Sequence, residues 1–372
     1  MEFHSNYFAA KDKNWLNVCI LNLRFYRLLM HPRALLFLLF IGLQFSATGQ
    51  EVESDPQSAI PWIRIPADIR ASGMGDVGVA TEADVNAARW NPAKLVWLGH
   101  TSELGVSYLP YLRTLINDAF LLGGSYAKRI NDESALAVGF TYFTVGEVEL
   151  RETIDQEALL VQPNTFTLDV AYGLQLNDEW SVGAGLRFIS DNQQTPDDLT
   201  SDRAGNALAA DVGVFYRSKL QVTEGNDSRW RAGVALSNVG TPIAYVSDGP
   251  ESPLPTTLRF GVGRDIIYDY DSSLSLTLEA NTMVVAVSDN SLGLGLGAEY
   301  VFRSDLFLRS GYYLDTADNT DRNYLTLGAG VRRGNLLVDV SYLFSTSRVV
   351  NPFENTLRVG ISLGFGQRFY HY

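Results

Sequence analysis

The chain has 372 residues, 46% of them hydrophobic and 12% aromatic, so it is long enough for one large β-domain or two ordinary ones. Its net charge of −13 argues against nucleic acid as a partner, because nucleic-acid binding needs clustered Lys and Arg. Cys19 is the single cysteine, which excludes a framework of disulfides.

Residues 1–49 are expected to be a secretory signal peptide rather than part of the fold. An apolar run at 34–43 follows a basic residue, and 47–49 are the small residues that a signal peptidase reads. The alternative is a signal anchor that is retained in the membrane. The apolar run is short for such an anchor. Met30 is expected to be the true initiator, so that Cys19 is never made and the mature chain has no thiol.

Residues 50–101 do not alternate and are expected to form an N-terminal periplasmic or plug segment ahead of the first strand. Gly73, Gly75 and Gly78 indicate tight turns, and in letters they match the dinucleotide fingerprint. That fingerprint needs a strand before it and a helix after it, and neither is visible, so nucleotide binding is not expected. A wide barrel holds a water channel unless something fills it. We therefore prefer a plug to the alternative of a tail that lies outside the lumen.

Residues 102–372 consist of fourteen short segments in which apolar and polar residues alternate. Between Phe166 and Leu176, for example, the even positions are apolar and the odd positions are small or polar. Successive side chains of a strand lie on opposite faces, so each segment has one apolar face. The segments are 102–109, 119–130, 134–148, 164–177, 180–191, 206–220, 229–238, 256–268, 273–287, 291–302, 306–315, 322–333, 335–346 and 355–368. The prediction is an all-β fold, a 14-stranded antiparallel transmembrane β-barrel.

A soluble β-sandwich gives the same alternation, and three features favour the barrel. The polar faces hold glycines and single charges such as Arg187, Glu279, Arg309 and Asp339, which suits a large lumen. The apolar faces carry almost no charge, as a lipid-facing surface requires. Aromatic residues gather beside the short turns, where a membrane girdle is expected: Trp180, Trp230, Tyr268, Tyr270, Tyr300 and Phe302.

The connections between the predicted strands alternate in length. Turns such as 131–133 and 303–305 are short, whereas 192–205 and 239–255 are long and polar. Outer-membrane barrels keep their short turns in the periplasm and their long loops outside. The pattern therefore predicts a multi-pass outer-membrane protein with both termini in the periplasm. The aromatic residues that end the chain at 369–372 are also common at the end of such barrels.

A family resemblance rests on the segment before the strands. Asn91-Pro92-Ala93 ahead of fourteen strands resembles the FadL-like outer-membrane family, in which an N-terminal hatch with this motif plugs the barrel. The block from Met74 to Lys94 resembles the PorV branch of the PorV/PorQ proteins of the type IX secretion system of Bacteroidetes. The resemblance implies a non-enzymatic shuttle. Such a shuttle binds the C-terminal signal domain of secreted cargo at the translocon barrel and delivers it to the surface sortase of the attachment complex.

Two other functions stay open: a FadL-like channel for hydrophobic small molecules, and a lipopolysaccharide-modifying deacylase. A serine hydrolase needs a base beside its nucleophile, and only His100 and His371 are left after signal removal. Asp315, Asp318 and Asp321 have the spacing of a calcium loop but lack its Gly and distal Glu. We therefore expect no catalytic residue, cofactor or metal.

The external loops are expected to form the docking surface, because three of them carry apolar residues in an otherwise polar rim. These stretches are 110–116, 243–246 and 349–353. We predict that they contact the translocon wall, the cargo signal domain or outer-membrane lipid. The residues singled out are Tyr111, Leu112, Leu115, Ile243, Tyr245, Val349 and Phe353.

Overall fold

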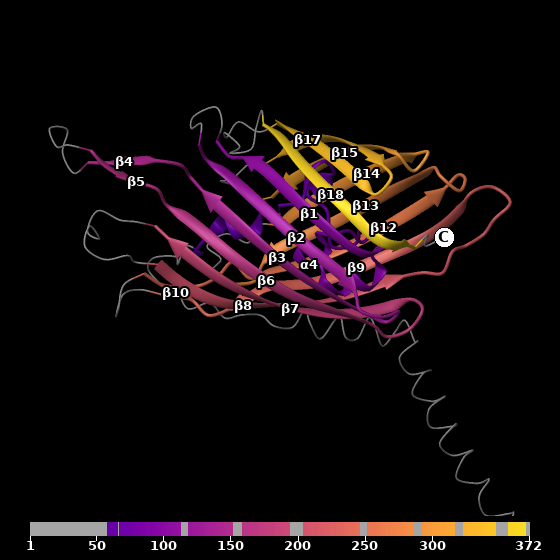
Figure 1. The fold of residues 1–372 in the computed structure, drawn as a ribbon, viewed down its shortest axis with the longest axis horizontal. Coiled ribbons are helices and arrows are strands. Elements are labelled where there is room, and N and C mark those ends of the chain that lie inside the picture. The colour runs from indigo at the N-terminus through magenta and orange to yellow at the C-terminus, as the bar shows by residue number, and fades with distance from the viewer. Residues whose placement is uncertain are drawn as a thin grey trace, which may run out of the picture. The chain divides into compact units, whose positions relative to one another are not determined.

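Fourteen antiparallel strands, each hydrogen-bonded to two neighbours, form a closed barrel (Figure 1). The computed structural model describes residues 58–65, 67–112, 118–151, 158–193, 204–245, 251–285, 292–316, 323–346 and 356–369. Within the described residues, four short helices precede the strands: η1 Pro61–Arg64, α3 Ile69–Ser72, α4 Ala87–Trp90 and η2 Pro92–Trp97. The wall strands are β1 His100–Pro110, β2 Phe120–Arg129, β3 Ser134–Thr144, β6 Asn164–Gln175, β7 Trp180–Asn192, β8 Ala204–Arg217, β9 Asp227–Gly240, β12 Thr257–Ile267, β13 Ser273–Met283, β14 Leu292–Phe302, β15 Leu306–Asp315, β16 Tyr324–Arg333, β17 Leu336–Ser345 and β18 Leu357–Arg368. Two small hairpins lie in the connections: β4 Val148–Leu150 with β5 Leu159–Val161, and β10 Ile243–Ala244 with β11 Glu251–Ser252.

The prediction of a closed fourteen-stranded barrel is confirmed, and each predicted segment overlaps one wall strand. The first and last strands, β1 and β18, pair with each other and close the wall. The two small hairpins were not predicted, because strands of two or three residues are too short to show an alternation. Within the described part of the chain, no helix is long and apolar enough to cross a membrane.

Each wall strand has an apolar outer face and a polar or small-residue inner face. In β6, Leu168 is exposed on the outer face, whereas Thr167 and Asp169 are buried on the inner face. Leu168 lies opposite Phe140 of β3 and Phe188 of β7, and residues directly opposite each other share a face of the sheet. The outer surface is therefore a continuous apolar band suited to lipid.

The short turns gather at one end of the barrel and the long connections at the other. His100 of β1 and Arg368 of β18 pair at the short-turn end. The predicted aromatic residues are exposed near this end, and Trp180 lies 4.8 Å from the ring of Tyr216. This arrangement matches the girdle expected at a membrane interface.

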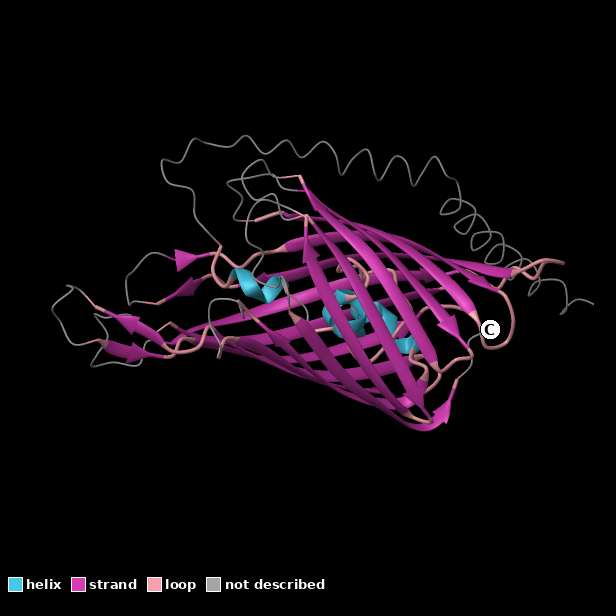
Figure 2. Cartoon of the chain, turned by 90° about the horizontal axis from the view of Figure 1, so that it is seen from above, coloured by secondary structure: helices cyan, strands magenta, loops and turns pink. Residues whose placement is uncertain are grey.

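Residues 58–99, called here the inner segment, lie inside the barrel, where Figure 2 shows the short helices enclosed by the strands. At the long-loop end, the amide of Ala59 donates to Pro253 O at 2.9 Å. At the short-turn end the segment leads directly into β1. The described part of the segment therefore occupies the lumen, as the plug interpretation expects.

The path of the inner segment bears on one expectation. Both chain ends were predicted on the short-turn side, which stays a prediction for the N-terminus because residues 1–57 lie outside the described residues. The first described residues lie at the long-loop end, where Trp62 Nε1 donates to Thr165 Oγ1 at 2.8 Å. The reason is that the segment crosses the whole lumen before β1 begins. The signal peptide predicted at 1–49 lies outside the described residues.

Glycines of the inner face let the backbone of the inner segment touch the wall. A Cβ added to Gly311 of β15 would lie 2.1 Å from the amide nitrogen of Gly75. A Cβ on Gly183 of β7 would lie 2.4 Å from the amide nitrogen of Ala93. Real Cβ atoms do not approach backbone this closely, so these positions exclude any larger residue. The small inner residues, taken from the sequence as a sign of an open lumen, instead make room for the plug.

Substitution of Gly183 by Ala is expected to destabilise the docked inner segment by about 1–3 kcal/mol, because the new methyl group overlaps the backbone at Ala93. The matched control is Gly185→Ala in the same strand and on the same face, where the Cβ would lie 3.5 Å from Ala171 Cβ, an ordinary contact. Urea unfolding of the barrel in detergent measures both. Equal midpoints for the two variants would show that the inner segment does not contact the wall as described.

Candidate functional site

The Asn91-Pro92-Ala93 motif clamps the inner segment to the wall. Asn91 is fully buried, and its Nδ2 donates to Val214 O of β8 at 3.0 Å and to Val79 O at 3.3 Å. Its Oδ1 accepts from the amide of Ala93 at 3.1 Å and so caps η2, whose first residue is Pro92. An amide side chain that both donates and accepts is required here. The motif therefore has a structural role at the contact between plug and wall.

The glycines of the fingerprint-like stretch serve wall contacts rather than a phosphate. The amides of Gly78 and Val79 donate to Glu279 Oε2 of β13 at 2.7 and 2.9 Å. The amide of Gly75, whose φ is 68°, donates to Thr326 Oγ1 of β16 at 2.8 Å. The amides that would have to be free to bind a nucleotide phosphate therefore already donate to a carboxylate.

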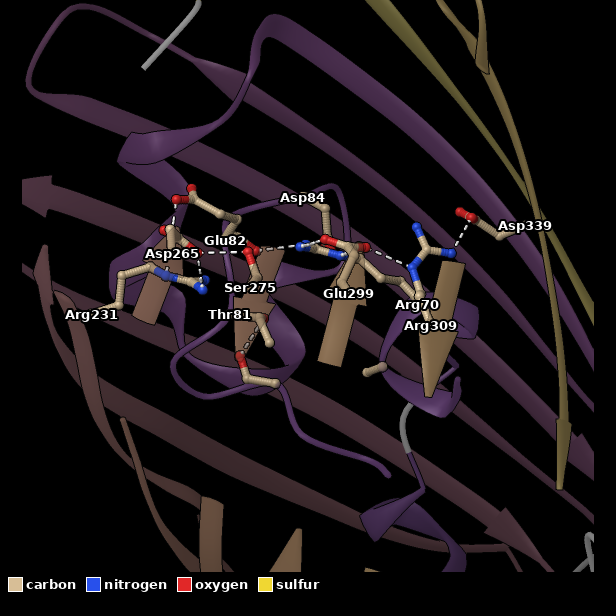
Figure 3. Close-up of polar contacts among 12 residues, drawn as sticks. Arg70, Thr81, Glu82, Asp84, Arg231, Asp265, Ser275, Glu299, Arg309 and Asp339 are labelled. Atoms are coloured by element: carbon tan, nitrogen blue, oxygen red, sulfur yellow. Dashed lines mark hydrogen bonds and ion pairs between the residues drawn. The ribbon is translucent and has the colours of Figure 1, made fainter. Parts of the chain in front are cut away.

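Ion pairs tie the inner segment to the opposite side of the wall (Figure 3). The Arg70 cluster consists of Arg70, Asp84, Glu299, Arg309 and Asp339. Arg70 makes a bidentate pair with Glu299 of β14, with distances of 2.7 Å from Nη2 and 3.0 Å from Nε. Arg309 of β15 joins Glu299 to Asp339 at 2.6 and 2.5 Å. Because these charges are buried, each one must keep its partner, and loss of one leaves an uncompensated buried charge.

Two further clusters repeat this arrangement. The Arg231 cluster consists of Glu82, Arg217, Arg229, Arg231 and Asp265, and Arg231 Nη2 lies 2.6 Å from Asp265 Oδ1. The Arg187 cluster consists of Arg89, Asp169, Arg187, Asp211 and Asn238, and Arg187 Nη2 lies 2.8 Å from Asp211 Oδ2. In each of these two clusters one charge belongs to the inner segment and the others to the wall, whereas the Arg70 cluster has two charges from the inner segment, Arg70 and Asp84.

An open cavity of about 290 Å³ lies on the short-turn side of the inner segment. Arg70, Glu82 and Asp84 line its inner boundary, and Asp271 and Arg368 line it near the short turns. The inner segment therefore ends this cavity instead of letting it continue through the barrel.

Asp68 and Lys94 are among the titratable groups of the inner segment whose pKa values are shifted. Burial, reinforced by the charge of Asp84, raises the pKa of Asp68 to about 6, although Asp68 accepts from Trp90 Nε1 at 2.8 Å. Burial lowers the pKa of Lys94 to about 8. The Nζ of Lys94 donates to Gly78 O at 2.7 Å and to Thr81 Oγ1 at 2.9 Å. Lys94 therefore holds the turn that presents its amides to Glu279.

The rim residues chosen from the sequence have mixed environments. Tyr111 and Leu112 are half-buried at the long-loop end. Tyr245 is half-buried too, and its hydroxyl donates to Asp191 Oδ2 at 2.6 Å. Ile243 is fully buried against Ile60 and other residues of the inner segment and wall, so its prediction as an exposed docking residue is wrong. Leu115, Val349 and Phe353 lie outside the described residues.

The candidate catalytic and metal residues are not brought together. His100 is buried, with Nδ1 3.2 Å from Glu103 Oε1. Among the described residues, no group of three or more His, Cys, Asp or Glu side chains could hold a metal ion. Asp318, Asp321 and His371 lie outside those residues.

Sequence reasoning missed the partners of the inner charges. Arg187, Glu279, Arg309 and Asp339 were expected on the inner face of a large lumen, but as single charges without named partners. The glycines that surround these charged residues indicated a packed interior, because glycine permits close approach of another backbone.

These features define an outer-membrane β-barrel whose lumen is occupied by its own N-terminal segment. A family model described as "Type IX secretion system protein PorV" matches residues 50–290. The chain therefore belongs to the PorV family and is an outer-membrane barrel of the type IX secretion system. No curated protein sequence matches the chain.

Solved structures share the fold at low identity. The P. putida toluene transporter TodX has a TM-score of 0.52 at 12% identity, covering 81% of this chain and 99% of that chain. The TodX monoaromatic hydrocarbon channel deltaS2 mutant has a TM-score of 0.52 at 11% identity, covering 81% and 100%. A Pseudomonas aeruginosa FadL homologue has a TM-score of 0.45 at 13% identity, covering 80% and 98%. The likeness to TodX concerns the barrel fold alone.

Asp68 makes the stability of the plugged barrel depend on pH. Its folded pKa of about 6 lies above the ordinary value of 3.8, so between these values the folded state binds a proton that the unfolded state does not. The wild type should therefore gain up to about 3 kcal/mol over Asp68→Asn as the pH falls from 7.5 to 4. Unfolding midpoints in detergent across this range measure the difference, and parallel curves would contradict the assignment.

Proposed function

We propose that the protein is a non-enzymatic docking and shuttle subunit of the type IX secretion system. It binds the C-terminal signal domain of secreted cargo at the translocon barrel and delivers the cargo to the surface sortase of the attachment complex. Membership of the PorV family is the observation that carries this proposal. The filled lumen supports it, because a barrel closed by a buried, ion-paired segment acts through its rim rather than its interior.

In the proposed orientation, the long loops face the cell exterior and the short turns face the periplasm. Leu112 lies at the outer rim with a φ of 48°, next to Tyr111, whose ring packs edge-on against Phe143 at 5.1 Å. The proposed docking loops contain Tyr111, Leu112, Leu115, Tyr245, Val349 and Phe353. Their apolar side chains contact the translocon barrel, the cargo domain or outer-membrane lipid, while Ile243 anchors one loop from beneath.

A variant of Leu112 and Leu115 tests the docking surface without disturbing the fold. Tyr111 and Tyr245 are left in place because they pack on Phe143 and bond to Asp191. Leu112→Asn removes the apolar side chain and suits the positive φ, which Asn tolerates. Combined with Leu115→Ser, it should lower cargo co-purification from native membranes about tenfold or more, as expected for loss of central interface residues.

The matched control is Val222→Ser, which removes an apolar side chain that is 76% exposed at the opposite, short-turn end. It should leave co-purification unchanged. Heat-modifiable migration in gels shows whether each variant still forms a barrel. Undiminished cargo recovery with the Leu112 and Leu115 double variant would contradict the assignment of these loops as the docking surface.

The likeness to TodX favours a second candidate, transport of a hydrophobic small molecule, since its printed descriptions call it a toluene transporter and a hydrocarbon channel. The inner segment that occupies the lumen argues against this candidate, although the wall shifts register between β1 and β18 and between β8 and β9. Purified protein in liposomes should therefore give no uptake of a fluorescent hydrophobic ligand above that of empty liposomes. Saturable uptake that requires the protein would favour the channel instead.

A further inference from the structure

A small cavity lies where the inner segment meets β7, β9 and β12. Its volume is about 20 Å³, which is room for one particle the size of a water molecule. Four arginines line it, Arg64 and Arg89 from the inner segment and Arg187 and Arg259 from the wall, together with the hydroxyl residues Ser237 and Thr257. The docking function does not use this site.

The carboxylates that pair with these arginines lie outside the cavity lining. Arg187 pairs with Asp211 at 2.8 Å, and Arg259 Nη1 lies 3.0 Å from Glu279 Oε1. Neither carboxylate belongs to the lining, which contains no Asp or Glu. The sides of the Arg187 and Arg259 guanidinium groups that face the cavity therefore meet hydroxyl, amide and aromatic groups instead of negative charge.

Negative charge is also shared between two of the arginines. Arg89 Nη1 and Arg187 Nε approach the same oxygen, Oδ1 of Asp169, with Arg89 at 3.3 Å. The other oxygen of Glu279 is occupied by two backbone amides of the inner segment. Three carboxylates thus form ion pairs with Arg89, Arg187 and Arg259, and they also accept hydrogen bonds from other donors.

The crowding of positive charge carries a free-energy cost. Burial and the nearby charge of Arg187 lower the pKa of Arg89. Guanidinium groups do not lose their proton in proteins, so the cost is not removed by deprotonation. A negative ion in the cavity offsets it directly, because Coulomb attraction is strong where water is excluded.

We propose that this cavity binds one monatomic anion, chloride in the cell, between the guanidinium groups of Arg89, Arg187 and Arg259. The volume excludes phosphate and carboxylate ligands, which have several heavy atoms. Because Arg89 belongs to the inner segment and the other two arginines to β7 and β12, the bound anion fastens the plug to the wall. Chloride is therefore a structural ligand of the closed barrel.

The experiment compares the melting temperature of the purified barrel in chloride with that in gluconate at constant ionic strength. Chloride at about 100 mM should raise the melting temperature of the wild type by about 3 °C or more, since a ligand that binds only the folded state stabilises it. Arg89→Gln should abolish this shift. Arg309→Gln is the matched control, because it removes a buried, ion-paired arginine of the lumen that does not line the cavity.

Anomalous diffraction from crystals of the wild type in bromide keeps the proposal testable if a variant fails to fold. A bromide peak in the cavity between Arg89, Arg187 and Arg259 supports the proposal. A cavity that holds only water in bromide overturns it, as does a chloride shift of the same size in the wild type and in Arg89→Gln.

Discussion

The backbone of the inner segment lies at contact distance from glycines on the inner face of the wall, and most other features of the interior follow from this contact. The approach is closest where Gly75 meets Gly311 and where Val79 meets Gly233. Backbone that is pressed against a strand loses access to water, so its polar groups need partners within the protein. The wall supplies them through Glu279, which accepts two amides, and through Thr326. The glycines and the polar inner residues of the wall therefore act together: the glycines allow the contact, and the polar residues bond the backbone that it buries.

The buried charges fix where the inner segment sits. Arg70 and Arg89 each reach a carboxylate on a wall strand, and the wall arginines reach carboxylates in turn. Such pairs add little net stability, because the charges lose their hydration on burial. A displaced inner segment, however, leaves several charges without partners at once. The clusters therefore favour one docked position of the plug over any other.

The alternation of apolar and polar residues predicted the strands and their approximate ends, because strand geometry repeats every two residues. The uncharged apolar faces, the small and charged inner residues and the aromatic girdle then favoured a barrel over a sandwich. The path of the inner segment was not predictable in this way. Arg70 and Glu299 are 229 residues apart in the chain, and no local pattern links them. The same reason explains Ile243, which reads as an exposed loop residue but is covered by Ile60 and its neighbours. Asn91-Pro92-Ala93 was recognised by resemblance, while its hydrogen bonds to Val79 and Val214 required the structure.

The central claim is that the inner segment closes the barrel, so that the protein acts as a docking platform and not as a pore. Electrical recording from the purified protein in a planar lipid bilayer tests this claim most directly. The account predicts no steady conductance above that of the bare membrane after verified insertion. Stepwise, ohmic conductance from the wild type would contradict it, because a plug held as described leaves no continuous water path through the lumen.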